Sequence, residues 1–303
     1  MFTGLVNALA RGTRKPAGRT AAVTIPQAKE PSSRWGKPGT ALPRHRVRVV
    51  GVERETPDAV TLLLEPLSGE PVAFSAGQYL THCFEIDGTV VKRAYSISAA
   101  EGGQLACTIK AIENGVASRF VFDHVDVGYE YPVIGPSGDF VLPADPTTSL
   151  AFLAAGSGIT PVMAMIDTAL QQNPDRLISL VYASRRQSDI IFADRLEQLE
   201  RKYAGLAITW VLSRPDDGWS GLTGRLDEEQ AARLLQARPD AEIYLCGPEE
   251  LAAATAGALA ADGVAPGRIH RERFYTSARH TTVLPTLPQP IEFRRSNLTV
   301  IAQ

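Results

Sequence analysis

Cysteine is scarce in this sequence of 303 residues, which contains only Cys83, Cys107 and Cys246. An odd number of cysteines without short spacing supports neither a disulfide framework nor a metal site made of cysteine alone, and it fits a reducing cytoplasm best. Long apolar runs are also missing: none approaches the roughly 18 residues of a membrane-spanning helix, and no signal peptide is evident. We therefore expect a soluble, cytoplasmic protein without a transmembrane segment.

The signature motifs of several large enzyme classes are absent as well. The sequence has no Walker phosphate-binding loop and no His-Glu-x-x-His zinc motif, and its five histidines are scattered. A Gly-x-Ser-x-Gly nucleophile elbow is excluded, because residue 155 is alanine where glycine is needed. These absences argue against P-loop, zinc-protease and serine-hydrolase chemistry.

Charge is distributed unevenly along the chain. The formal net charge is −2, but residues 1–44 carry eight Lys or Arg and only one acid, Glu30, so the remainder carries −9. This N-terminal arm is rich in Pro, Gly, Ser and Thr and has no sustained periodicity, which is typical of a mobile or draped segment. An organellar transit peptide would have a similar composition.

The first turns of the arm are its only periodic part. Phe2, Leu5, Val6 and Leu9 fit one face of a basic amphipathic helix that touches a membrane surface or a partner. A tail that is disordered, or packed on its own domain, is the simpler interpretation. Nucleic-acid binding is disfavoured, because the only aromatic residue of the arm beyond Phe2 is Trp35.

The body of the chain changes its pattern near Ser149, and its length suits two domains. Before that point short alternating strands predict a small antiparallel barrel, with strands at 47–52, 60–65, 79–86, 90–97, 105–111 and 129–134. One helix is expected at 117–124, with Phe120 and Val121 facing inward.

After Ser149, strands alternate with helices, which predicts a doubly wound parallel sheet of the α/β class. The expected strands are 150–155, 177–183, 207–212 and 242–246, and the expected helices are 161–172, 189–202, 227–236 and 249–261. Capping or acidic residues stand at three of the helix starts, namely Ser188 or Asp189, then Asp227, then Glu249 with Glu250.

The first of these strands, Leu150 to Ala155, runs into the glycine-rich turn Gly-Ser-Gly-Ile-Thr-Pro. Gly156 and Gly158 let the backbone approach a ligand without a Cβ atom, and the N–H groups of the following helix attract phosphate. Thr160 can cap that helix, with Pro161 in its first turn. Because the sixth position is Pro rather than Gly, this turn alone is equally consistent with an ordinary strand-to-helix connection.

Three further motifs favour a nucleotide-binding turn over an ordinary strand-to-helix connection. Arg-Ala-Tyr-Ser (93–96) and Gly-Pro-Ser-Gly-Asp-Phe (135–140) end barrel strands, and Cys-Gly-Pro (246–248) ends the last sheet strand. With the glycine turn they follow the order of the plant-type ferredoxin–NADP reductase superfamily, which the sequence resembles from about His45 to Phe274. The resemblance implies an FAD-binding β-barrel at 45–146 and an NAD(P)-binding domain at 147–275. It also implies an enzyme that takes hydride from NAD(P)H onto FAD and releases single electrons.

The resemblance assigns roles to the barrel residues. Strand alternation puts Arg93 and Tyr95 on one face, where the guanidinium would hold a flavin phosphate and the phenol ring would pack on the flavin. Ser96 points elsewhere and would hydrogen-bond the flavin N5. Residues 115–118 would form a second phosphate contact, which implies FAD rather than FMN. The implied flavin-binding set is Arg93, Ala94, Tyr95, Ser96, Lys110, Gly115, Ala117, Ser118 and Phe274, whose ring would cover the flavin.

The resemblance also assigns the nicotinamide site. The implied set is Gly156, Ser157, Gly158, Ile159, Thr160, Pro161, Cys246, Gly247 and Pro248, and the implied catalytic residues are Ser96, Cys246 and Glu272. Ser184 and Arg185 follow the second strand without an adjacent carboxylate, which favours NADPH, with NADH possible. Without the resemblance, Arg93 and Arg185 are surface arginines, Tyr95 is a core aromatic and Cys246 is an inert thiol.

The end of the chain predicts a partner. Residues 276–290 are polar and proline-rich like a linker, and residues 291–303 resemble the opening hairpin of a plant-type ferredoxin domain. Such a domain holds its 2Fe-2S cluster with four cysteines, and none follows Cys246, so we expect a truncated form of a longer reductase. The acceptor would be that ferredoxin domain, serving an oxygenase, hydroxylase or desaturase. Two alternatives remain: a self-contained flavin or quinone reductase, and a docking adaptor without flavin.

Overall fold

The computed structural model describes residues 42–101, 104–236, 238–274, 290–293 and 298–301. The predictions for the arm before residue 42, and for nearly all of the linker at 276–290, lie outside these residues. Among the helices described, none has the length and apolarity to cross a membrane.

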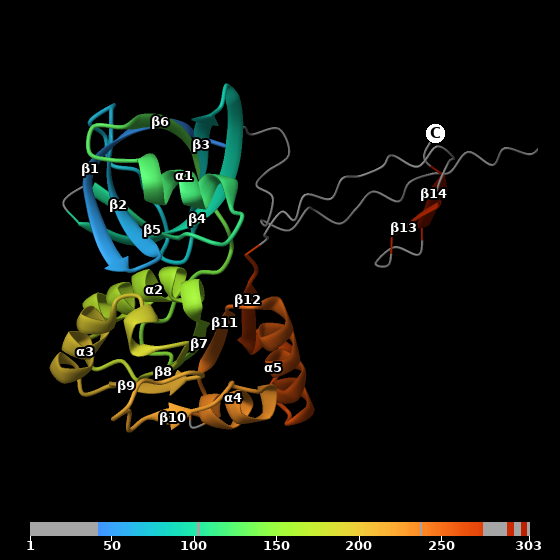
Figure 1. The fold of residues 1–303 in the computed structure, drawn as a ribbon. Coiled ribbons are helices and arrows are strands. Elements are labelled where there is room, and N and C mark those ends of the chain that lie inside the picture. Colours follow the sequence, from blue (N-terminus) through green and yellow to red (C-terminus); the bar gives the residue numbers. More distant parts are fainter. Residues whose placement is uncertain (1–41, 102–103, 237, 275–289, 294–297, 302–303) are drawn as a thin grey trace, which may run out of the picture. The chain divides into compact units, whose positions relative to one another are not determined.

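Six antiparallel strands close into a barrel in the order β1-β2-β5-β4-β3-β6, as the alternation predicted (Figure 1). Their bounds are β1 Arg44–Thr56, β2 Ala59–Pro66, β3 Tyr79–Ile86, β4 Thr89–Glu101, β5 Gln104–Lys110 and β6 Glu130–Ser137. β1 and β4 are longer than predicted, at 13 residues each, and each contains register shifts that let a long strand bend around the barrel.

The inside of the barrel is filled by alternate residues of its strands. On β3, Leu80, His82 and Phe84 are all fully buried. Burial lowers the pKa of His82 to about 3, so the ring is neutral, and its Nδ1 lies 2.9 Å from the Tyr131 hydroxyl. The predicted helix is α1, Val116–His124, and it buries Val121 while Phe120 is only partly buried.

The second part is a doubly wound sheet, in the strand order β10-β9-β8-β7-β11-β12, with all neighbours parallel. The predicted strands are β7 Leu150–Ala155, β8 Ile178–Ser184, β9 Leu206–Leu212 and β11 Glu242–Cys246. The edge strands β10, Leu222–Thr223, and β12, Ile269–Glu272, were not predicted. One is two residues long and the other reads Ile-His-Arg-Glu, so neither has the apolar pattern of a buried strand.

Helices cover both faces of this sheet: α2 Ile159–Gln172, α3 Ala193–Lys202, α4 Glu228–Leu235 and α5 Glu249–Ala261 (Figure 1). Alternation along β7 explains the two cores. Leu150 and Phe152 belong to the apolar cluster of α2 and α3, while Ala151 and Leu153 belong to that of α4 and α5.

The predicted helix at 189–202 is wrong at its start, because α3 begins only at Ala193. The preceding backbone is held by side chains of β8 instead. The Ser184 hydroxyl donates to the Asp189 carbonyl, and the Ile191 N–H donates to the Tyr182 hydroxyl. Ser188 and Asp189 therefore lie in a 3₁₀ turn and cap no helix, whereas Asp227 caps α4 as predicted, through a bond from the Gln230 N–H.

The barrel and the sheet domain share one apolar cluster. Phe140, from the Gly-Pro-Ser-Gly-Asp-Phe motif after β6, packs edge-on against Tyr244 of β11 with ring centroids 5.3 Å apart. The Tyr244 hydroxyl donates to the Val141 carbonyl at 2.9 Å. At the end of the described chain, β13 (Pro290–Phe293) and β14 (Leu298–Ile301) pair as the expected antiparallel hairpin.

Candidate active site

The glycine turn joins β7 to α2 at the carboxyl edge of the sheet. Gly156 has φ +54°, which is the left-handed region that glycine adopts at little cost. A Cβ atom on Gly158 would overlap the backbone carbonyl oxygen of Cys246. The missing side chain of Gly158 thus lets the turn pack on the end of β11, which differs from the close approach to a ligand that we expected.

Thr160 does not cap α2, contrary to our prediction. The helix begins at Ile159, one residue earlier, so Thr160 lies inside its first turn and donates to the Ser157 carbonyl at 3.0 Å. The cap residue is Gly158, which offers no side-chain acceptor. A 3₁₀ turn, Gly156–Gly158, leads directly into α2, and the Ile159 N–H donates to the Gly156 and Ser157 carbonyls. The N–H groups left for a ligand with negative charge are therefore those at the start of this turn.

Cys246 ends β11 beside this turn, and it is 1% exposed. In the parallel register it lies opposite Ala154 on one side and Glu272 of β12 on the other. Burial, assisted by the charge of Glu272, raises the pKa of the Cys246 thiol well above its usual value. The thiol is therefore neutral at physiological pH and is no nucleophile.

Ser96 of β4 lies directly opposite Tyr79 of β3, a residue that the sequence did not single out. The pKa of Tyr79 is raised by burial and then by the charge of Glu272, which places Tyr79 near that carboxylate. Ser96 thus lies beside Tyr79 in the barrel, and Glu272 of the sheet domain acts electrostatically on both Tyr79 and Cys246.

The Gly-Pro-Ser-Gly-Asp-Phe motif contacts Tyr79 and its neighbour Gln78. Gly138 lies against the Tyr79 ring, and its carbonyl accepts a bond from the Gln78 side chain at 3.1 Å. In the sequence, this motif was evidence only through its position among the four motifs of the superfamily. Its contact with Tyr79 was not visible in the sequence, because the two segments are about 60 residues apart.

The flavin-binding residues of β4 divide between its faces, as alternation predicted. Ser96 is 4% exposed, and among the residues that the structure describes none hydrogen-bonds its hydroxyl. Tyr95 packs edge-on against His82 with ring centroids 5.3 Å apart, and burial raises its pKa to about 12. Within the part of the chain that the structure describes, the Arg93 guanidinium hydrogen-bonds only the carbonyl of its neighbour Lys92.

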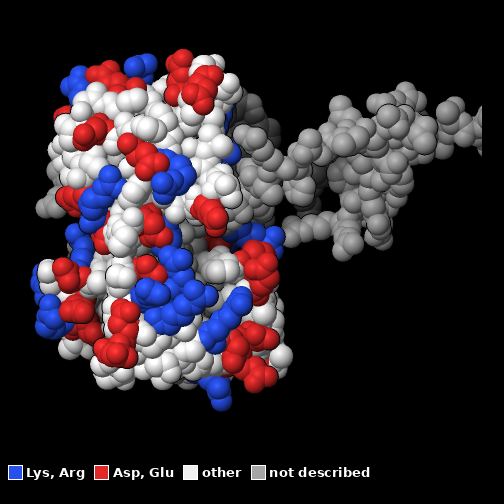
Figure 2. Space-filling model, viewed as in Figure 1, with Lys and Arg blue, Asp and Glu red and all other residues white. Residues whose placement is uncertain are grey.

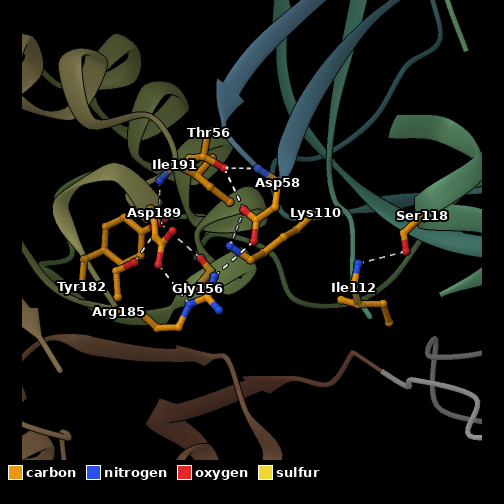
Figure 3. A network of polar contacts seen from close by, with 11 residues as sticks. Thr56, Asp58, Lys110, Ile112, Ser118, Gly156, Tyr182, Arg185, Asp189 and Ile191 are labelled. Atoms are coloured by element: carbon orange, nitrogen blue, oxygen red, sulfur yellow. Dashed lines mark hydrogen bonds and ion pairs between the residues drawn. The ribbon is translucent and has the colours of Figure 1, made fainter. Parts of the chain in front are cut away.

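The second predicted phosphate contact is the start of α1. Its cap residue is Gly115, which has no side-chain bond to the helix, so the first N–H groups of α1 are also left for an anion. The Ser118 hydroxyl accepts a bond from the Ile112 N–H at 3.3 Å, which tightens the turn that leads into the helix (Figure 3).

Lys110 and Arg185 meet across the domain junction, through Asp58 in the turn between β1 and β2 (Figure 3). Asp58 lies 2.8 Å from the Lys110 ammonium and 3.2 Å from the Arg185 guanidinium, whose Nε lies 3.0 Å from Asp189. We expected no carboxylate beside Arg185, and this expectation is wrong. Asp58 is about 127 residues away in the sequence, and Asp189 approaches through the 3₁₀ turn.

A cavity of about 710 Å³ connects this network with the loop before α1, since it is lined by Lys110, Arg185, Arg119 and residues 111–114. The cavity therefore reaches from Arg185 to the loop just before the predicted phosphate contact at residues 115–118. In the view of Figure 2, Lys and Arg side chains gather over the junction of the two domains with acidic side chains beside them. A second cavity of about 660 Å³, between the barrel and α3, contains none of the predicted site residues.

Comparison with known proteins agrees with this arrangement. Residues 48–142 match the family described as an oxidoreductase FAD-binding domain, and residues 152–257 match the oxidoreductase NAD-binding domain. The chain is 35% identical to one component of the 1,2-phenylacetyl-CoA epoxidase of Escherichia coli over 243 residues, which cover 77% of this chain and 68% of that protein. The chain belongs to the ferredoxin–NADP reductase superfamily.

Other members of the superfamily are comparably similar. The reductase subunit of stachydrine N-demethylase from Rhizobium meliloti is 31% identical over 235 residues, covering 76% of this chain and 67% of that protein. The crystal structure of the Amycolatopsis cytochrome P450 reductase GcoB superposes with a TM-score of 0.70 at 26% identity, covering 79% of this chain and 72% of that one. The chain thus spans about two thirds of the length of the two curated relatives. Its FAD-binding and NAD-binding domains and its reductase relatives show that it is an NAD(P)H-dependent flavoprotein reductase.

The residues present fit a bound FAD. The Ser96 hydroxyl has no hydrogen-bond partner among the described residues, no side chain caps the start of α1 at Gly115, and Arg93 supplies a cation on the same strand as Tyr95. Phe274 follows β12 and is 42% exposed although it is aromatic, as suits a ring that covers a ligand.

Proposed function

We propose that this protein takes hydride from a nicotinamide dinucleotide onto FAD and passes the electrons singly to a 2Fe-2S ferredoxin domain that serves an oxygenase, hydroxylase or desaturase. The observation that supports the proposal is that Ser96 lies opposite Tyr79 in the barrel, while Glu272 of the sheet domain acts on both Tyr79 and Cys246. When bound, FAD supplies the step between a two-electron donor and one-electron acceptors.

The barrel residues hold and orient the flavin. The Arg93 guanidinium and the first N–H groups of α1 bind its phosphates, and the Tyr95 ring packs on the ring system. Ser96 would donate a hydrogen bond from its hydroxyl to N5, the atom that accepts the hydride. Because the Ser96 residue is only 4% exposed, this hydrogen bond would form in a site from which water is largely excluded.

The sheet domain brings the nicotinamide to the same place. The glycine turn that leads into α2 binds the pyrophosphate, and the neutral Cys246 thiol packs beside the nicotinamide ring. Burial, and then the charge of Glu272, raises the pKa of both Cys246 and Tyr79, so both stay protonated at physiological pH. No side chain in this group has to change its proton during hydride transfer.

The acceptor is proposed by analogy with the relatives, which are named as the reductase component of an N-demethylase and a component of an epoxidase. We also propose a cytoplasmic location, since Cys83, Cys107 and Cys246 are all free thiols.

The acceptor proposal is tested by comparing electron sinks. The purified, FAD-loaded chain should reduce ferricyanide from NAD(P)H, but should reduce cytochrome c poorly until a plant-type 2Fe-2S ferredoxin is added. Free flavin and a quinone serve as control acceptors. Rapid turnover with the quinone, and no stimulation by the ferredoxin, would instead identify a self-contained quinone reductase.

A further inference from the structure

The choice between NADH and NADPH depends on the residues around Arg185, because Arg185 directly follows β8. β8 lies beside β7 in the sheet, so Arg185 lies next to the glycine turn that receives the pyrophosphate. In doubly wound nucleotide domains, the side chains after the second strand contact the adenosine ribose. An acid there binds the 2′-hydroxyl of NADH, whereas a free arginine binds the 2′-phosphate of NADPH.

The Arg185 guanidinium is not free in this structure. Its Nη2 lies 3.2 Å from Asp58 Oδ2, and its Nε lies 3.0 Å from Asp189 Oδ2 (Figure 3). Two of its donor positions are thus occupied by carboxylates from two different segments. Although the Arg185 side chain is 57% exposed, any second anion has to compete with both.

Asp58 is the more firmly held of the two carboxylates. Its Oδ1 accepts from Lys110 at 2.8 Å and from the Thr56 hydroxyl at 2.9 Å. Its backbone carbonyl accepts from the Ala111 N–H at 2.7 Å, which fixes the turn itself. Partial burial raises the pKa of Asp58, but the bonds from Lys110 and Thr56 outweigh that effect, so the pKa is lowered and the carboxylate is charged at neutral pH.

The charges of this network cancel. Asp58 and Asp189 offset Lys110 and Arg185, so a 2′-phosphate with its charge of about −2 at pH 7 finds no net attraction and two carboxylates close by. A neutral 2′-hydroxyl has no such difficulty, since it can donate a hydrogen bond to a carboxylate oxygen. We infer that Asp58, a residue of the flavin barrel, makes the enzyme prefer NADH over NADPH by occupying Arg185 and Lys110.

Asp58 rather than Asp189 makes this choice. Asp189 lies four residues from Arg185 in the same segment and pairs with it locally. Asp58 instead comes from the other domain and engages both cations at once. If its charge were removed, Lys110 and Arg185 would both face the cavity of about 710 Å³ with only one acid of the network left, which is a cationic site suited to a phosphate.

The inference rests on the proposed function, and it is tested with Asp58→Asn in the FAD-loaded protein. The matched control is Glu130→Gln, which removes the same charge from an exposed barrel pair with Arg48. Calorimetry with 5′-AMP and with adenosine 2′,5′-bisphosphate gives the affinity ratio of the two probes without any turnover. Steady-state rates give the matching ratio of kcat/KM for NADH and NADPH.

Wild type should bind 5′-AMP at least as tightly as the bisphosphate, and should have the higher kcat/KM with NADH. Asp58→Asn should shift both ratios toward the phosphorylated ligand by roughly 10-fold, and less at high salt, while Glu130→Gln leaves them unchanged. An unshifted ratio in Asp58→Asn, or a wild type that prefers the bisphosphate or NADPH, would overturn the inference.

The wild-type measurements keep the inference testable even if Asp58→Asn does not fold. A wild type that reduces its flavin with NADH but binds neither probe would also overturn it, because the adenosine end would then not be held at Arg185. A wild type whose flavin is reduced by neither nucleotide would overturn the proposed function itself, which is a different result.

Discussion

At the scale of single residues, the two sides of β4 have different tasks. Alternation along the strand predicted that Arg93 and Tyr95 share one face, and the structure places Tyr95 against the neutral ring of His82. Ser96 faces the other way, toward Tyr79. The Ser96 hydroxyl has no hydrogen-bond partner among the described residues, so its hydrogen-bonding capacity is available to a ligand.

Ser96→Ala should slow flavin reduction by NAD(P)H by roughly 100-fold, because the lost hydrogen bond matters most while charge develops at N5. Bound flavin per protein should stay near the wild-type value, since Arg93 and the start of α1 still hold the phosphates. Stopped-flow absorbance measures the rate, and chromatography of the released flavin measures the content. A variant reduced as fast as wild type would remove Ser96 from the mechanism.

Cys-Gly-Pro and Gly-Pro-Ser-Gly-Asp-Phe lie at the ends of β11 and β6 as predicted, whereas Arg-Ala-Tyr-Ser lies in the middle of β4, because that strand continues to Glu101. The roles that the family resemblance gives to these residues stay predictions. The part that was missed depends on contacts between distant segments. Tyr79 stands in an ordinary strand pattern, and only the β3–β4 register and Glu272 give it a role. Asp58 reads as a turn residue, and its pairing with Arg185 appears only when the barrel meets the sheet domain.

At the scale of elements, the carboxyl edge of the sheet is held together by backbone contact between the glycine turn and β11. The strand and helix bounds of this part were largely predicted, because β7 and α2 are continuous apolar runs. The start of α3 was not predictable, since the bonds that delay it come from Tyr182 and Ser184 on the preceding strand.

Gly158→Ala should lower the free energy of unfolding by about 1–3 kcal/mol, because the new Cβ meets the Cys246 backbone, which cannot rotate away. Gly257→Ala is the matched control: a Cβ there meets nothing within 4 Å inside α5, so this variant should gain up to about 1 kcal/mol from helix propensity. Urea unfolding midpoints measure both. If the two variants were equally stable, the turn would not pack as described.

At the scale of the whole molecule, the barrel and the sheet domain are joined by an apolar cluster around Phe140 and Tyr244 and by the polar network around Asp58. The first fixes the barrel against β11, and the second lies beside Arg185, which follows β8. The order of the two domains could be predicted, because short alternating strands precede Ser149 and strands alternate with helices after it. The joining contacts could not, because they pair residues about 100 or more positions apart.

The central claim is that hydride passes from a nicotinamide dinucleotide to FAD at this junction, and anaerobic mixing of the purified chain with NADH or NADPH tests it most directly. The account predicts that the flavin absorbance bleaches in a single turnover, and that the flavin released by heat is FAD. A chain that binds no flavin, or whose bound flavin stays oxidised with both nucleotides, would contradict it.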